Sequence, residues 1–142
     1  MKVGIPSEIK AQESRVGLTP QSVQQLTNHG HEVLVENNAG FGAGFENADY
    51  EKAGAKIASS AADVFNDSDM IVKVKEPQSE EVKMLRENQL LFTYLHLSAA
   101  PELTKGLVDS KSICIAYETV TDENNRLPLL APMSAVAGPK AD

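Results

Sequence analysis

Short apolar runs alternate along this chain with segments that have helical spacing. The runs that we predict to be strands are residues 2–6, 31–36, 69–75, 89–96 and 112–118. All but the first are nearly continuous in apolar side chains, which is typical of strands covered on both faces. The alternation of such strands with helical segments predicts a mostly parallel sheet with crossover helices.

Helix boundaries are marked by capping residues between these runs. Thr19 followed by Pro20 predicts a helix start, and Gly30 predicts its end. Further helices are expected over 49–53, after a Ser60/Asp63 capping box to about residue 66, from a Ser79 cap through 85, and over 101–110. About five strands and five helices fit one open α/β domain of Rossmann-like or flavodoxin-like type.

A glycine-rich loop follows the second predicted strand, at residues 40–44. A G-x-G-x-x-G dinucleotide fingerprint that begins at Gly40 requires glycine or alanine at position 45, where this chain has Phe45. A start at Gly42 requires a small residue at position 47, which is Asn47. We therefore interpret the loop as a backbone turn, and any dinucleotide should be bound mainly elsewhere.

Composition narrows the class of protein. The chain has 142 residues and a net charge of -7, which disfavours nucleic acid and anionic membranes as partners. It contains neither an apolar run long enough for a membrane span nor an apolar signal segment at its start. The single cysteine, Cys114, cannot form an intramolecular disulfide. We expect a cytoplasmic protein and assign no metal site.

Polar side chains at the ends of strands are the candidates for chemistry, because open α/β sheets bind ligands outside the carboxyl ends of their strands. Arg15 lies in the loop after the first strand, Lys75 ends the run from 69, and His96 ends the run from 89. Arginine and lysine bind carboxylates, and histidine can transfer a proton near neutral pH. Together the three residues predict a site for a 2-oxo or 2-amino acid.

Each of these residues also has a simpler interpretation. Arg15 could be a surface cation that pairs with Glu13. Lys75 shares its strand face with Lys73, and a lysine at a strand end commonly reaches solvent. His96 could cap its strand through a backbone hydrogen bond. Residue types and spacing alone leave both interpretations open.

The chain resembles the alanine dehydrogenase and transhydrogenase alpha-subunit family through several ordered motifs. These are GIPSEIK at 4–10, ESRVGLTP at 13–20, ENNAGFGAGF at 36–45, VKVKEP at 72–77 and TYLHL at 93–97. The resemblance implies reversible NAD-dependent oxidative deamination of L-alanine to pyruvate and ammonia, by an enzyme that assembles into homo-oligomers. It further implies that Arg15 and Lys75 hold the substrate, that His96 is the acid/base, and that Ser134 approaches the cofactor.

The resemblance also implies a domain organisation. Residues 1–131 would form the N-terminal substrate domain, and 132–142 would begin an interdomain helix that is altered or truncated, since Pro139 would break it. The NAD domain is expected to be absent, so the chain alone should be inactive and could self-associate through exposed apolar surface. The alternatives are the related transhydrogenase domain, which lacks the histidine matching His96, and a non-catalytic flavodoxin-like binding or assembly module.

Overall fold

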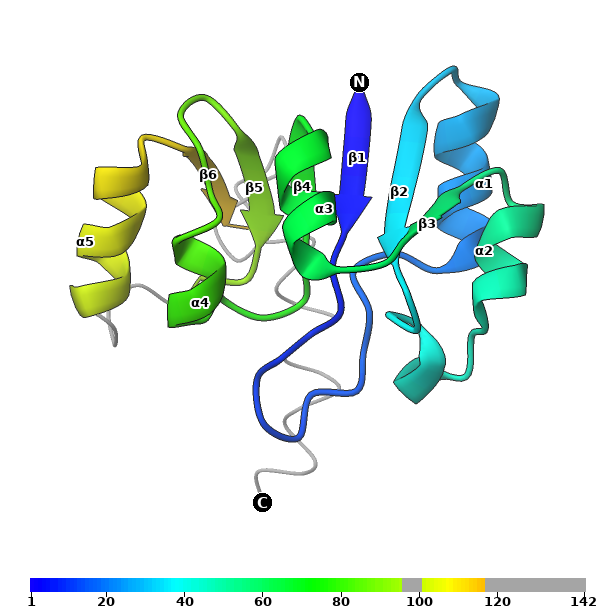
Figure 1. The fold of residues 1–142 in the computed structure, drawn as a ribbon, viewed down its shortest axis with the longest axis horizontal. Helices are drawn as coiled ribbons and strands as arrows, with labels where there is room; N and C mark the ends of the chain where they lie inside the picture. The colour runs from blue at the N-terminus through cyan, green and yellow to red at the C-terminus, as the bar shows by residue number, and fades with distance from the viewer. Residues whose placement is uncertain (96–100, 117–142) are drawn as a thin grey trace, which may run out of the picture.

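A six-stranded, entirely parallel sheet organises the part of the chain that the computed structural model describes, residues 1–95 and 101–116 (Figure 1). The strand order is β3-β2-β1-β4-β5-β6, and every neighbouring pair is parallel. The strands are β1 Lys2–Ile5, β2 Glu32–Glu36, β3 Lys56–Ala58, β4 Met70–Val72, β5 Leu90–Thr93 and β6 Ile113–Ala116. The predicted α/β class and parallel sheet are confirmed.

Helices connect successive strands. They are α1 Pro20–Asn28, α2 Asn47–Lys52, α3 Ala61–Asp67, α4 Ser79–Val82 and α5 Pro101–Ser110, and a 3₁₀ turn, η1, spans Phe41–Ala43. Thr19 caps α1 as predicted, because its hydroxyl accepts a hydrogen bond of 3.2 Å from the amide of Ser22. The glycine-rich loop forms η1 and ends at Gly44 with a φ of 89°, so it is the backbone turn that the sequence predicted.

One predicted cap and the reciprocal half of one predicted capping box differ from the structure. Helix α4 is capped by Gln78 instead of Ser79, and Gln78 forms a reciprocal capping box with Glu81. The Ser60 hydroxyl does cap α3 through the amide of Asp63, but the Asp63 carboxylate accepts from the Ser59 hydroxyl.

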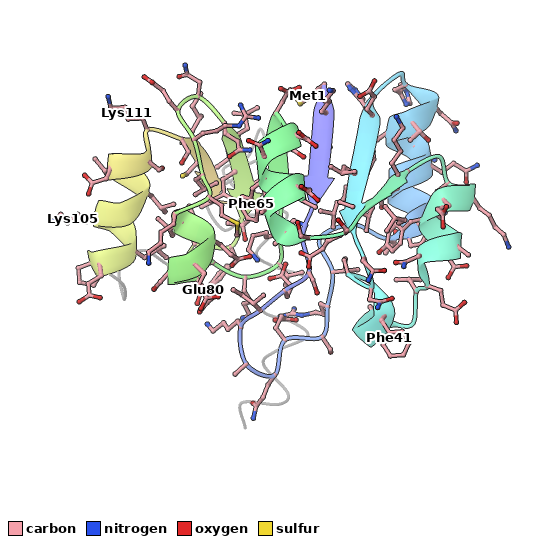
Figure 2. The ribbon with its side chains drawn as sticks, in the orientation of Figure 1. Met1, Phe41, Phe65, Glu80, Lys105 and Lys111 are labelled. Carbon is pink, nitrogen blue, oxygen red and sulfur yellow. The ribbon has the colours of Figure 1, made fainter. Side chains whose placement is uncertain are left out.

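The core is divided into two clusters by the sheet. On one face α1 and α2 pack against β1 and β2, with Val23, Tyr50, Val33 and Val35 fully or almost fully buried. On the other face α3 packs against β1, β2 and β3, and α4 packs against α5. Side chains of these helices and of β4 and β5 form the second cluster, which contains Phe65, Ile71, Leu91, Leu85 and Leu107. Figure 2 shows Phe65 between α3 and the strands. Side chains alternate between faces along each strand, which places Val33 and Val35 in one cluster and Leu34 in the other.

The sequence interpretation was wrong about two strands. It missed β3, a three-residue edge strand. It also expected the last strand to be covered on both faces, whereas Ile113 is 48% exposed and Ile115 37% exposed. The predicted run at 69–75 is only partly β4, although the pairing with β5 continues past Val72 through a hydrogen bond from the Lys73 amide to the Phe92 carbonyl.

The strand order creates a switch point between β1 and β4. The chain leaves β1 towards α1 on one face of the sheet and leaves β4 towards α4 on the other. Figure 1 shows all the arrowheads at one edge of the sheet, with the loop between β1 and α1 extending beyond it. Ligands of open α/β sheets bind at such a point.

Candidate functional site

The loop that carries Arg15 lies across the carboxyl end of β4. A Cβ atom on Gly17 would be 2.5 Å from the Val72 carbonyl oxygen, so only glycine allows this approach of two backbones. Gly42 of η1 also lies close to this loop, since a Cβ there would be 2.9 Å from the Ser14 carbonyl oxygen. The two glycines therefore place the Arg15 loop between η1 and β4, at the switch point.

Arg15 is paired with Glu13 within this loop. Its Nε and Nη2 atoms donate to the two carboxylate oxygens of Glu13 over 2.9 and 2.8 Å, a bidentate arrangement. The Arg15 side chain is 52% exposed and that of Glu13 only 7%. The ion pair considered from the sequence is present, and its two hydrogen bonds orient the guanidinium.

Lys75 is near the same ion pair. Hydrogen bonding from Arg15 lowers the pKa of the Glu13 carboxyl, and the positive charge of Lys75 contributes to the same lowering. Lys75 is half-buried, and its Nζ lies 5.5 Å from the centre of the Tyr94 ring, in a cation–π contact. The structure thus brings Arg15 and Lys75, which are 60 positions apart in the sequence, to one end of the sheet.

A buried ionic cluster that sequence reasoning missed lies behind Lys75. The Lys73 ammonium is 3.0 Å from a carboxylate oxygen of Glu8 and 3.0 Å from one of Glu81, and the exposed fraction of these three side chains is between 1 and 2%. Glu8 also accepts from the backbone amides of Val74 and Lys75 over 3.0 and 3.1 Å. Burial raises the pKa of Glu81, while the charge of Lys73 opposes that rise.

Only one feature of the sequence indicates this cluster. Lys73 stands inside an apolar run, where an unpaired ammonium would be costly, so its presence there required a carboxylate partner. The partners are 65 residues earlier and 8 residues later in the chain, and no local pattern identifies them.

Two of the predicted site residues, His96 and Ser134, lie outside the described residues. The description ends at Leu95, immediately before His96, and resumes at Pro101. The roles of both residues stay predictions.

The glycine-rich loop and the helix after it are poorly suited to bind a dinucleotide. The first helix after the glycine loop, α2, begins with a capping box of Glu46 and Asp49, so two carboxylates occupy the end where a pyrophosphate would bind. Within residues 1–95 and 101–116 no three metal-binding side chains gather, and no helix there is long and apolar enough to cross a membrane.

The strand order and the cationic switch point define the class: an open, doubly wound α/β domain with a polar site at the carboxyl ends of its central strands. A family model described as "Alanine dehydrogenase/PNT, N-terminal domain" matches residues 4–137. The chain belongs to this family of alanine dehydrogenase and transhydrogenase N-terminal domains.

Individual relatives agree with the family match. The chain is 55% identical to an alanine dehydrogenase of Halomonas elongata and 56% identical to one of Staphylococcus epidermidis, each over 97% of this chain and 37% of the relative. A solved L-alanine dehydrogenase superposes with a TM-score of 0.93 at 53% identity, over 97% of this chain and 38% of that structure. A transhydrogenase from Sinorhizobium meliloti gives 0.78 at 30% identity, over 83% of this chain and 35% of that structure. The chain thus spans little more than a third of the length of these relatives.

Proposed function

We propose that this chain is the substrate-binding domain of an enzyme that catalyses the reversible NAD-dependent oxidative deamination of L-alanine to pyruvate and ammonia. The observation that carries the proposal is the placement of Arg15 and Lys75 together at the switch point of the sheet. A guanidinium and an ammonium at one end of the sheet suit a small 2-oxo acid, which presents a carboxylate and a carbonyl oxygen on adjacent carbons.

The residues would divide the work by their chemistry. Arg15 would bind the substrate carboxylate through its guanidinium, which Glu13 orients, and Lys75 would donate to the carboxylate or carbonyl oxygen. His96 would give and take the proton during addition of water and release of ammonia. NAD would supply the hydride acceptor, and we propose that it is bound mainly by a second domain, with Ser134 of this chain approaching it.

The domain organisation and setting follow the same proposal. Residues 1–131 would be the substrate domain and 132–142 the start of an interdomain helix, in a cytoplasmic homo-oligomer. The described residues alone would not catalyse the reaction, because NAD would be bound mainly by the second domain.

The main alternative is the related transhydrogenase domain. The motif at 93–97 contains His96, and the family resemblance implies that transhydrogenase domains lack a histidine at this position. The identity of 53% to the solved L-alanine dehydrogenase also exceeds the 30% to the solved transhydrogenase. A purely structural module is a second alternative, and it predicts that the cations bind no small acid.

An NMR titration of the chain with pyruvate tests the proposal. We expect saturable shifts of the His96 ring and of the amides near Arg15 and Lys75. Arg15→Ala should weaken binding by about tenfold or more, since a charge-assisted contact contributes about 1.5–3 kcal/mol.

Lys105→Ala is the matched control, because Lys105 is an exposed cation on α5, far from the Arg15 loop in Figure 2. It should leave the pyruvate affinity unchanged. Equal losses in both variants would indicate a nonspecific charge effect. An absence of shifts at millimolar pyruvate would contradict a preformed substrate site in this chain.

A further inference from the structure

We propose that Glu8 and Thr93 are positioning residues that hold Lys75 in place for the substrate. The two residues contact the backbone of Lys75 from opposite sides. This inference rests on the proposed function only in what Lys75 binds, because the placement of Lys75 can be measured without any substrate.

Glu8 fixes the amide side of Lys75. One carboxylate oxygen accepts the Lys75 N–H over 3.1 Å and the Lys73 ammonium over 3.0 Å, and the other accepts the Val74 N–H over 3.0 Å. The two carboxylate oxygens therefore accept hydrogen bonds from three consecutive residues, 73–75, directly after β4. Because Glu8 comes from the same loop as Arg15, this carboxylate also links the two cations of the site.

Thr93 fixes the carbonyl side of Lys75. Its side chain, fully buried at the end of β5, donates a hydrogen bond of 2.8 Å from Oγ1 to the Lys75 carbonyl oxygen. The next residue, Tyr94, provides the ring beside the Lys75 ammonium. With the N–H and the C=O both held, the direction of the Lys75 Cα–Cβ bond is fixed, and the ammonium lies beside the Tyr94 ring.

Glu81 separates positioning from simple charge balance. It contacts the same Lys73 ammonium at 3.0 Å and is as deeply buried as Glu8, and its other carboxylate oxygen accepts from the backbone amide of Gln78, the N-cap of α4. Glu8→Gln and Glu81→Gln therefore remove the same charge from the same buried lysine. Glu8 is the one of the two that bonds the Lys75 amide.

The first measurement is the NMR shift of the Lys75 ε-methylene protons, which we expect the Tyr94 ring current to move upfield. We expect Glu8→Gln and Thr93→Val to reduce this upfield shift, because each removes one backbone anchor of Lys75. Glu81→Gln should preserve it. Thr93→Val has nearly the shape of threonine, so it tests the proposal even if Glu8→Gln does not fold.

The second measurement is pyruvate affinity in the same variants. Glu8→Gln and Thr93→Val should each weaken binding by about tenfold, which corresponds to about 1.4 kcal/mol. Glu81→Gln should bind like the unaltered chain, and Glu8→Asp should recover part of the lost affinity.

The outcomes distinguish the two proposals. An unchanged Lys75 shift in both Glu8→Gln and Thr93→Val would overturn the positioning role, whatever pyruvate does. Equal losses of shift in Glu8→Gln and Glu81→Gln would also overturn it, since charge balance would then explain the effect. A normal pattern of Lys75 shifts in a chain that does not bind pyruvate would support the positioning of Lys75 and contradict the proposed substrate.

Discussion

Two lysines of one strand end have opposite environments in this protein. Lys73 is 1% exposed and lies between the carboxylates of Glu8 and Glu81, whereas Lys75 is half-buried beside Tyr94. A buried ammonium must be paired, so Lys73 contributes to the architecture of the strand end. Lys75 can reach a ligand because another lysine has taken the structural role.

Glu81 gives the buried cluster a measurable pH dependence. Its pKa is raised above the ordinary value of 4.5, chiefly by burial. The folded chain thus holds this proton more tightly than the unfolded chain, so the contribution of Glu81 to stability is fully present below 4.5 and is lost as pH rises through the higher folded pKa.

Glu81→Gln removes this titration. We expect the free energy of unfolding of the unaltered chain to fall relative to that of Glu81→Gln as the pH is raised from about 4 to about 8. Urea unfolding of both proteins across that range measures the difference. A difference that stays constant, or changes in the opposite direction, would show that Glu81 keeps an ordinary or lowered pKa.

For single residues, the sequence identified the site candidates Arg15 and Lys75 and missed Glu8 and Thr93, which contact the Lys75 backbone. Arg15 and Lys75 follow apolar runs and could be recognised locally, and the structure brings them together. Glu8 and Thr93 could not be recognised, because their role consists of contacts with a segment that is distant in the sequence. The placement of His96 stays a prediction.

At the scale of secondary-structure elements, the Arg15 loop lies in close contact with the end of β4, and this contact supports the site. It depends on Gly17, where a side chain would meet the Val72 carbonyl oxygen at 2.5 Å and its carbonyl carbon at 2.9 Å. Both are backbone atoms of a paired strand and cannot rotate away.

We therefore expect Gly17→Ala to cost about 1–3 kcal/mol of stability, the usual range for forced overpacking, and to weaken pyruvate binding by displacing Arg15. Gly106→Ala in α5 is the control, because a Cβ there would meet only a methyl group of Val82 at 3.0 Å. Denaturant unfolding and the pyruvate titration measure both effects. If the two substitutions behave alike, the close approach at Gly17 does not matter.

The elements themselves were largely predictable, with specific exceptions. Apolar runs located five of the strands, and Thr19 with Pro20 located the start of α1. Strand β3 was missed because Lys56, Ile57 and Ala58 form a run too short to show a period. The cap of α4 was assigned one residue late, since Gln78 can cap only with the help of Glu81.

At the scale of the whole molecule, strand β6 presents apolar side chains to solvent. The ladder pairs Ile115 with Phe92 of β5, and both Ile113 and Ile115 are substantially exposed on that face. Exposed β-branched residues on a strand at the end of the described strand order favour association with another apolar surface.

We expect the chain to self-associate through this face, and the double variant Ile113→Thr with Ile115→Thr to shift it towards the monomer while keeping strand propensity. Light scattering over a range of concentrations measures the association. Val108→Thr is the control, because Val108 is exposed on α5 and belongs to no strand. A monomeric unaltered chain at all concentrations would contradict this prediction.

The ionic link at Glu8 has a consequence for how the protein acquires its site. Its partners lie 65 to 67 residues away in the chain, across the junction of β1 with β4. Contacts of such long range form only after the intervening loop has been closed, and they form late in folding. A partly folded chain that contains only β1, β2 and β3 has Arg15 but no Lys75 beside it. Under the proposed function, competence to bind and completion of the sheet would coincide, and a ligand that bridges the two cations would stabilise the folded state by mass action.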